Sequence, residues 1–309
     1  MVLKTVIKED GIVIGIDETE NAVQYYEHYI RHGLQRLNCA PRDADICLAV
    51  PLKMHDSFRR RLAESVMESL NARSVFLISQ PLLSGYSSGA ATCTVVDCGY
   101  TYTSVMGMLN FYPLSESQLL LPVGGQDLDR YLIHLGNKTL RQMSPADVIY
   151  IKEHYCSVAP SLTSIGMQKR VSCSLPDGSK ITLDSELEMA PEMFFNPSLA
   201  GLADVLPLDQ AVVHAAFSVP DDRAYTILKR VFLSGGSLSL PGLRSRMKQR
   251  LVHKTLPEML EAVERHAQAD LAVWVGGSVF ASLSSFKQMC ISREDYREEG
   301  SRIISSRWL

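Results

Sequence analysis

The sequence predicts an α/β fold with two lobes and a smaller inserted subdomain. Short β-rich runs alternate with amphipathic stretches over residues 1–100, as they do in α/β domains. The pattern changes in the middle of the chain and resumes after Pro207. With 309 residues, 46% of them hydrophobic and 21% charged, the chain can bury a full core in one or two domains. This composition excludes a disordered or fibrous protein.

Two strands and a helix are expected at the start of the chain. Val2–Ile7 and Gly11–Ile16 are β-rich runs. A helix is expected between Asn21 and Leu37, because large apolar residues recur there at steps of three and four and share one face. The residues of this stripe are Val23, Tyr26, Ile30, Leu34 and Leu37.

A buried strand, a second helix and another strand are expected next. Ile46–Val50 is a continuous apolar run ended by Pro51, which is typical of a strand covered on both faces. A second helical stripe follows, made of Phe58, Leu62, Val66 and Leu70. Ser74–Ser79 is the next expected strand, and the small-residue segment Ser84–Ala91 comes after it.

The middle of the chain predicts a strand pair and then a hairpin. Cys93–Asp97 and Thr103–Met108 are expected strands joined by a turn that contains Gly99. Val171–Leu183 is expected to form a hairpin, because Pro176–Gly178 has the residues that favour a tight turn. A smaller insert is therefore expected in this region.

Two glycine pairs follow apolar runs in the last third of the chain. Val231–Leu233 leads into Ser234–Gly236, and Leu271–Val275 leads into Gly276 and Gly277. Both apolar runs are expected to be strands that precede helices. Because glycine lacks a Cβ, each pair indicates a close approach of the backbone to another backbone or to a ligand.

Charge and cysteine content exclude several classes of protein. The 31 Lys and Arg residues nearly balance the 34 Asp and Glu residues, so nothing indicates a dedicated nucleic-acid binder. The seven cysteines include no C-x-x-C pair and favour a reducing compartment over a disulfide framework or a zinc site. No apolar run approaches the length of about 18 residues that spans a membrane, so a soluble intracellular protein is expected.

Two further patterns have an ordinary and a functional interpretation. His28 and His32 have the spacing of a helical metal pair but lack an accompanying H-E-x-x-H motif, so a solvated helix face is favoured. A basic stretch favours a charged helix surface, with contact to an acidic partner as the alternative. It consists of Arg244, Arg246, Lys248, Arg250 and Lys254.

Several longer segments resemble actin and actin-related proteins. The resemblance is strongest in VFLSGGSLSLPGLRSRM and in LAVWVGGSVFASLSSFKQMCISREDYREEG, and it extends upstream through VIYIKEHYCSVAPS, LPVGGQDLDRYL and SQPLLSGYSSGAATCTVVDCG. It implies an actin/hexokinase-like (ribonuclease H-like) fold of two lobes with an inserted subdomain. Residues 1–120 would form the first lobe and the start of the second, and residues 121–206 second-lobe elements with the insert. Residues 207–270 would complete the second lobe, and residues 271–309 would return to the first.

The N-terminal segment departs from the family pattern. VLKTVIKEDGIV resembles a strand that lies well inside the actin chain, so the first phosphate loop and part of the first lobe's sheet are expected to be missing. An incomplete sheet leaves an open edge, and a partner subunit is expected to cover it. The alternative is an incomplete gene model, with a native chain that begins earlier.

The resemblance also implies a nucleotide site. Gln80 matches the glutamine that positions the attacking water, and Asp97 matches an aspartate that holds hydrated Mg²⁺. The residues implied for nucleotide binding are Asp97, Gly99, Gly125, Lys152, Glu153, Gly235 and Gly236. Other family positions are altered. In the phosphate loop and the strand after it, Tyr100 stands where the resemblance implies a metal-facing aspartate, Thr101 a glycine, and Ser104 a histidine near the attacking water. Beside the base, Leu240 stands where it implies an adenine-stacking tyrosine and Asp270 a lysine. ATP hydrolysis is therefore not expected, and the cofactor is expected to be absent or residual ATP or ADP with Mg²⁺.

A cleft for partner helices is implied in the same way. Its lining residues would be Tyr86, Gly89, Phe280, Leu283, Ser285 and Met289. Without the resemblance, apolar residues at this helical spacing would be interpreted as ordinary core. With the resemblance, a groove that binds a partner helix is favoured equally with ordinary core.

The resemblance favours a non-catalytic structural subunit of a cytoskeletal or motor-associated assembly, cytoplasmic and bound to other subunits, actin or actin-related proteins among them. Neither nucleic acid nor membrane is an expected partner. One alternative is an ATP-binding filament protein that hydrolyses ATP slowly. Others are a subunit of a chromatin-remodelling complex in the nucleus and, least favoured, a small-molecule kinase of the same superfamily.

Overall fold

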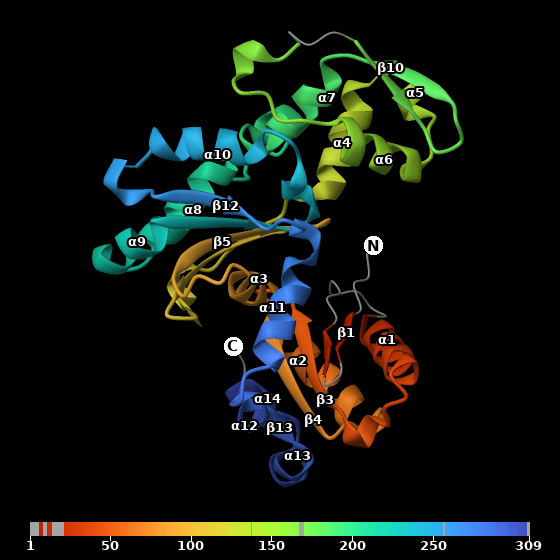
Figure 1. Cartoon of the computed structure of the whole chain (residues 1–309), viewed down its shortest axis with the longest axis vertical. Helices are drawn as coiled ribbons and strands as arrows, with labels where there is room; N and C mark the ends of the chain where they lie inside the picture. Colours follow the sequence, from red (N-terminus) through yellow and green to blue (C-terminus); the bar gives the residue numbers. More distant parts are fainter. Residues whose placement is uncertain are drawn as a thin grey trace. The chain divides into compact units, whose positions relative to one another are not determined.

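The computed structural model describes residues 6–8, 11–13, 22–136, 138–166, 170–255 and 257–307. The chain divides into two units (Figure 1). Unit 1 comprises Met1–Ala91, Met108–Pro113 and Leu271–Leu309, and unit 2 comprises Thr92–Gly107 and Leu114–Asp270.

A three-stranded sheet lies at the centre of unit 1, in the order β13-β4-β3. β3 and β4 are parallel, and each of their residues is buried, as the continuous apolar runs predicted. β1 and β2 form an antiparallel pair, and β7 pairs antiparallel with the end of the strand before it, β6 (Thr103–Leu109). The strands are β1 (Val6–Lys8), β2 (Gly11–Val13), β3 (Asp45–Val50), β4 (Ser74–Ser79), β7 (Tyr112–Pro113) and β13 (Ile291–Ser292).

The helices of unit 1 bury the apolar stripes that the spacing predicted. On the first helix, Tyr26, Ile30 and Leu34 are all buried in the core beside β3 and β4. The expected strands at Val2–Ile7 and Gly11–Ile16 are confirmed where β1 and β2 are described, and their other residues lie outside the described part. The helices are α1 (Ala22–Arg36), α2 (Asp56–Glu64), α3 (Gln80–Ser87), α11 (Ala272–Ala281), α12 (Phe286–Met289), α13 (Arg293–Glu299) and α14 (Ile303–Ser306).

The expected strand at Leu271–Val275 is wrong, because this segment begins helix α11. A short apolar run looks the same in a buried strand and in a buried helix. The close backbone approach that the glycine pair predicted is confirmed at Gly276. A Cβ on Gly276 would overlap the carbonyl oxygen of Leu83 in α3, so this glycine allows two helices to pack closely.

Unit 2 contains the second sheet, in which the order β12-β11-β5-β6 is followed by β8. β11 is parallel to both β5 and β12, and β8 is antiparallel to β6. β5 is buried along its whole length. The strands of unit 2 are β5 (Cys93–Cys98), β6 (Thr103–Leu109), β8 (Leu119–Leu121), β9 (Val171–Ser174), β10 (Lys180–Leu183), β11 (Arg230–Ser234) and β12 (Ala262–Arg265).

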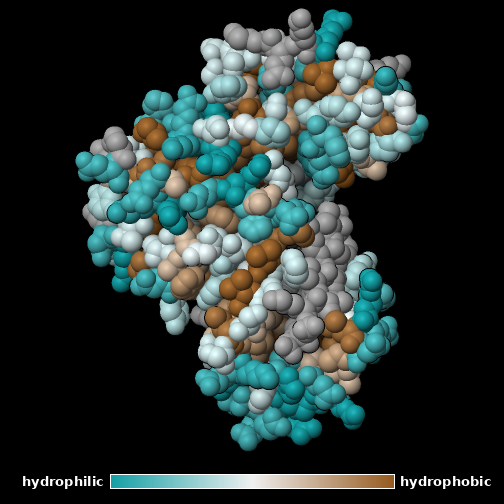
Figure 2. Space-filling view, in the orientation of Figure 1, coloured by the Kyte–Doolittle hydropathy of each residue, from teal (hydrophilic) through white to brown (hydrophobic). Residues whose placement is uncertain are grey.

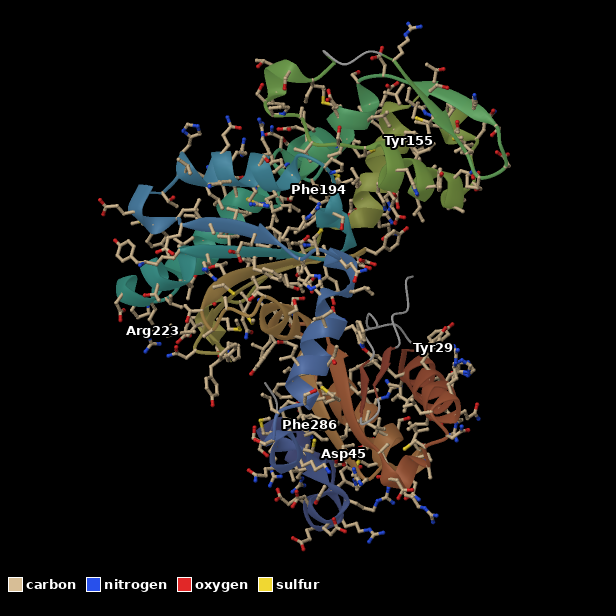
Figure 3. All side chains as sticks on the ribbon, in the orientation of Figure 1. Tyr29, Asp45, Tyr155, Phe194, Arg223 and Phe286 are labelled. Carbon is tan, nitrogen blue, oxygen red and sulfur yellow. The ribbon has the colours of Figure 1, made fainter. Side chains whose placement is uncertain are left out.

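The expected hairpin is confirmed as β9 and β10, with Cys173 opposite Ile181. The hydroxyl of Tyr155, labelled in Figure 3, donates to the Ser174 carbonyl and accepts from the Ser174 amide at 2.8 Å. The hairpin is thereby tied to α6. The helices of unit 2 are α4 (Gly125–Leu135), α5 (Lys138–Arg141), α6 (Pro145–Tyr155), α7 (Glu186–Met189), α8 (Leu208–Phe217), α9 (Asp221–Leu228) and α10 (Leu243–Val252).

Three residues of the basic stretch 244–254 form ion pairs with carboxylates inside unit 2. Arg246 is buried and lies 3.3 Å from the Glu192 carboxylate. Arg250 and Lys254 lie 3.0 Å and 3.6 Å from Asp209, whose side chain is fully buried. Most of this stretch therefore balances buried carboxylates of unit 2 rather than forming a free charged surface.

All seven cysteines are free thiols. Cys39 is partly exposed and the other six are buried. Burial raises the pKa of Cys98 to about 12 and that of Cys290 to about 11. Among the described residues, no helix is both long and apolar enough to cross a membrane.

Candidate functional site

The residues singled out in the sequence fall into two groups, one in each unit. Gln80 and the six residues expected to line a cleft belong to unit 1, whereas the residues expected at a nucleotide belong to unit 2. Gln80 is the first residue of α3 and is half-buried.

In unit 2 the loop candidates gather at the carboxyl ends of two parallel strands. Asp97 near the end of β5 pairs in register with Ser234 at the end of β11. Gly99 follows the first strand and Gly235 the second. Ligands of open α/β sheets bind outside the carboxyl ends of such strands, so the chain topology places these residues where a ligand site is expected.

Gly235 is required by the backbone packing itself. Its φ is 87°, a left-handed conformation that favours glycine. A Cβ at this position would overlap the carbonyl oxygen of Cys98, and the Gly235 amide donates to the Ala269 carbonyl at 2.8 Å. The left-handed backbone and the close contact with Cys98 therefore explain why this position is glycine, without any bound ligand.

The candidate Lys152 is buried on α6 and paired with an acid on α4. Its Nζ lies 2.8 Å from Oδ1 of Asp129, and the two side chains are only 8% and 10% exposed. The sequence reasoning missed Asp129. One signal was available, because Asp129 is four residues after Gly125 and therefore one helical turn along from it.

Tyr100 completes this group. The centroid of its ring lies 5.5 Å from the Lys152 Nζ, within the range of a cation–π contact. Burial, and then the nearby Asp129 charge, raises the pKa of the Tyr100 phenol. Burial also raises the pKa of Asp129, although the Lys152 ammonium opposes that rise. We call Tyr100, Asp129 and Lys152 the Lys152 cluster.

The first amides of α4 are bonded to the loop before it. The Gly125 amide donates to the Gly99 carbonyl at 3.0 Å, and the Gln126 amide donates to the Tyr100 carbonyl at 2.7 Å. The Ser237 hydroxyl donates to the same Gly99 carbonyl at 2.8 Å. The Gly125 and Gln126 amides are donors of the kind that bind an anion at a helix N-terminus, and here both are bonded to carbonyls of the chain.

The other candidates of unit 2 differ in exposure. Asp97 is buried, whereas Glu153 is exposed on the helix that carries Lys152. Leu240 is buried and Asp270 is exposed. Within the described part of the chain, no group of three His, Cys, Asp or Glu side chains could hold a metal ion.

In unit 1 the expected cleft residues lie around α3 and α11. The Tyr86 ring centroid is 5.4 Å from that of Phe280, which is almost fully buried and packs on Phe76. Leu283 is 40% exposed, Ser285 and Gly89 are exposed, and Met289 is half-buried. Phe280 therefore lies beneath a surface that Tyr86 and Leu283 help to form.

The sequence reasoning missed three further residues of this surface. Val279 on α11 is 45% exposed, and Tyr112, the first residue of β7, is 65% exposed. Phe111 precedes Tyr112, and its ring centroid lies 5.4 Å from that of Tyr86 with nearly parallel planes. Figure 2 shows the hydrophobic band that follows α11. We call Tyr86, Phe111, Tyr112, Val279 and Leu283 the apolar surface of unit 1.

A separate hollow of about 500 Å³ lies between α13 and the end of α2 in unit 1. Glu64 and Glu68 line one wall, and Arg293 and Arg297 line another. Tyr296 also lines the hollow, and its hydroxyl donates a hydrogen bond to the Glu68 carboxylate at 2.8 Å. None of the residues singled out in the sequence lines it.

Comparison with known proteins points to one family. Residues 1–150 and 140–308 match the family model described as Actin. Actin-like protein 9 of Mus musculus is 30% identical over 303 residues, which are 96% of this chain and 71% of that protein. The Bos taurus protein of the same name is 30% identical over 305 residues, and the Homo sapiens protein 28% over 302 residues. Each of these two alignments covers 95% of this chain and 71% of the relative.

Proposed function

The chain belongs to the actin family, and from this premise we propose that it is a non-catalytic structural subunit of a larger cytoskeletal or motor-associated assembly. Its two units have the mixed α/β architecture of the actin-like two-lobed fold. The proposed activity is protein–protein interaction. The observation that carries the proposal is the apolar surface of unit 1.

This surface is unusual because large apolar side chains are exposed together. Monomeric soluble proteins rarely expose large contiguous apolar patches, and such patches mark interaction sites. Val279 and Leu283 are four residues apart, and Phe111 stacks on Tyr86. An elongated apolar face suits an amphipathic helix laid into a groove, so we propose that a helix of another subunit binds here.

The altered loop of unit 2 supports a non-catalytic role. Tyr100 and Ser104 stand where the resemblance to actin implies a metal-facing carboxylate and a histidine near the attacking water. Phosphoryl transfer depends on positioned charges around the phosphate and its metal, and neither residue supplies one. We therefore assign neither ATP hydrolysis nor a required nucleotide to this chain.

The proposed partners are other protein subunits, including actin and actin-related proteins. The near balance of acidic and basic residues gives no support for a nucleic-acid partner. We place the assembly in the cytoplasm, associated with the cytoskeleton.

Affinity purification of the tagged full chain from its native cells tests the proposal. Crosslinking mass spectrometry would identify stoichiometric partners and their contacts. We expect Val279→Glu and Leu283→Glu to release the partner bound at the apolar surface, because a buried unpaired carboxylate is strongly unfavourable. Leu199→Glu is the matched control, since Leu199 is 44% exposed in unit 2. Retention of the same partners by all three variants would overturn the proposal.

One observation favours an ATP-binding filament protein as the second candidate. Asp97 and Ser234 lie in register at the carboxyl ends of β5 and β11, and ligands of open α/β sheets generally bind outside such strand ends. This candidate predicts that ATP with Mg²⁺ makes the purified chain assemble, which light scattering and sedimentation would detect. A chain that stays unassembled with and without ATP would remove it.

A further inference from the structure

The buried ammonium group of Lys152 has internal partners on several sides. Asp129 Oδ1 lies 2.8 Å from Nζ, and the carbonyl oxygen of Gly125 accepts from Nζ at 3.4 Å. The Tyr100 ring covers the group at 5.5 Å. A lysine ammonium has three hydrogen-bond donors and no acceptor. The chain thus supplies a carboxylate, a carbonyl and an aromatic face to this one cation.

An adenine nucleotide, which the resemblance to actin implies, does not fit this arrangement. The resemblance places Lys152 among the residues implied for nucleotide binding, but the ammonium is already paired with Asp129. The carboxylate would also repel the phosphates of a nucleotide placed nearby. The charge needed to attract the ligand is neutralised within unit 2.

The space beside Gly125 is filled as well. A Cβ built on Gly125 would lie 2.7 Å from the Ser237 hydroxyl, 3.4 Å from the Lys152 Nζ and 3.5 Å from a Tyr100 ring carbon. Even a methyl group would therefore crowd its neighbours here. A ligand could reach the Gly125 backbone from this side only after Tyr100 or Ser237 moved.

The first amide donors of α4 are occupied too. The Gly125 and Gln126 amides donate to the carbonyls of Gly99 and Tyr100, which closes the N-terminus of α4. An anion bound at this helix end would have to displace both bonds. The paired charge, the filled space and the occupied amide donors therefore all argue against a nucleotide bound beside Lys152.

We propose that the Lys152 cluster is an internal substitute for a bound nucleotide, which fills this part of unit 2 with the chain's own side chains. Unit 2 then keeps its folded state without ATP or ADP. Nucleotide-dependent switching, if any part of the assembly has it, belongs to another subunit. The inference concerns unit 2 alone and does not depend on the apolar surface of unit 1.

The first experiment compares the full chain with and without nucleotide. Thermal unfolding is followed at about 1 mM ATP or ADP with Mg²⁺, and equilibrium dialysis with labelled ADP measures binding directly. We expect the unfolding midpoint to move by less than about 1 °C, since a ligand that does not bind the folded state cannot stabilise it. Copurified stoichiometric ADP, or a midpoint raised by about 5 °C or more, would overturn the proposal.

Variants test whether the cluster itself excludes the ligand. Tyr100→Gly combined with Asp129→Asn removes the covering ring and the neutralising charge, so we expect nucleotide-dependent stabilisation to appear. Arg130→Ala is the matched control on α4, because the Arg130 side chain is 67% exposed and pairs with Asp127 rather than with Asp129. A folded double variant that gains no more affinity than the control would contradict the proposal.

A charge exchange covers the case in which the double variant does not fold. Lys152→Asp and Asp129→Lys are made singly and together. A paired buried charge predicts that the exchanged pair unfolds at a higher temperature than either single variant. If the exchanged pair instead lost as much thermal stability as the two single variants together, the pairing of Lys152 with Asp129 would be contradicted. The partner test on unit 1 has a separate readout, so either result can fail alone.

Discussion

Gly276 on α11 packs directly on the carbonyl oxygen of Leu83 on α3. The two helices meet at the position of the missing side chain, and α11 is apolar along nearly its whole length. This contact positions the helix that carries Val279. The part of the apolar surface of unit 1 that α11 contributes therefore depends on a residue with no side chain.

Gly276→Ala should destabilise unit 1. The added methyl would overlap backbone, which cannot move aside as a flexible side chain can. We expect a loss of about 1 to 3 kcal/mol in the free energy of unfolding, the usual cost of overpacking. Denaturant unfolding followed by circular dichroism measures it. Gly236→Ala is the control, because its nearest new contact is at 3.8 Å, and similar losses for both variants would contradict the helix-contact argument.

The turn at Phe111 predicts an unusual order of variant stabilities. Asn110 and Phe111 have φ of 50° and 67°, the left-handed values of a type I′ turn, in which glycine is preferred. Phe111→Ala keeps the backbone strain and loses the stack on Tyr86, whereas Phe111→Gly loses the stack and relieves the strain. We expect the glycine variant to be the more stable by about 1 kcal/mol, as measured by urea unfolding. An alanine variant of equal or greater stability would contradict this.

Asp45 should make the stability of unit 1 depend on acid pH. Burial raises the pKa of its carboxyl, but Arg73 and Ser74, which donate to Oδ1 at 2.7 Å, outweigh burial and lower the pKa below its ordinary value. The ionised group therefore stabilises the fold above about pH 4, and this stabilisation is lost as the pH falls further.

The measurement is the free energy of unfolding at about pH 5 and about pH 3. We expect Asp45→Asn to lose less stability between these values than the wild type. Asp43→Asn changes an exposed neighbouring carboxyl and should follow the wild type. If Asp45→Asn were as pH-sensitive as the wild type, Asp45 would not be the group responsible.

Two residues of α10 should differ sharply when truncated. Arg250 pairs with the fully buried Asp209, whereas Lys248 is exposed. Arg250→Met leaves much of the buried carboxylate's charge uncompensated, and we expect a loss of about 3 kcal/mol. Lys248→Met should change stability by less than about 0.5 kcal/mol. Comparable thermal midpoints for the two variants would show that Lys254 alone can balance Asp209.

The sequence predicted the elements whose signal is local. β4 spans Ser74–Ser79 as expected, and the hairpin turn lies at Pro176–Gly178, because alternation, apolar runs and turn residues act within a few positions. The strand expected at Leu271–Val275 was wrong for a reason that is not local. The helix formed by this segment packs on α3 through Gly276, and the local pattern of apolar residues does not contain that contact.

The candidate sites also depend on contacts that a local sequence pattern does not contain. The family resemblance identified Lys152, but its charge is balanced by Asp129 from another helix, and only the packing of α4 on α6 brings them together. Phe111 was also missed, because a phenylalanine in a left-handed turn contradicts the ordinary preferences of that position. Strained or charged residues of this kind are where local rules are expected to fail.

The distribution of thiols gives the protein a built-in reporter of its own fluctuations. Cys47 and Cys290 are buried in unit 1, and Cys93, Cys98, Cys156 and Cys173 are buried in unit 2. A buried thiol can react with an alkylating reagent only while the structure around it opens. The alkylation rate at each position, read by mass spectrometry, therefore gives the opening free energy of that part of its unit without any introduced probe.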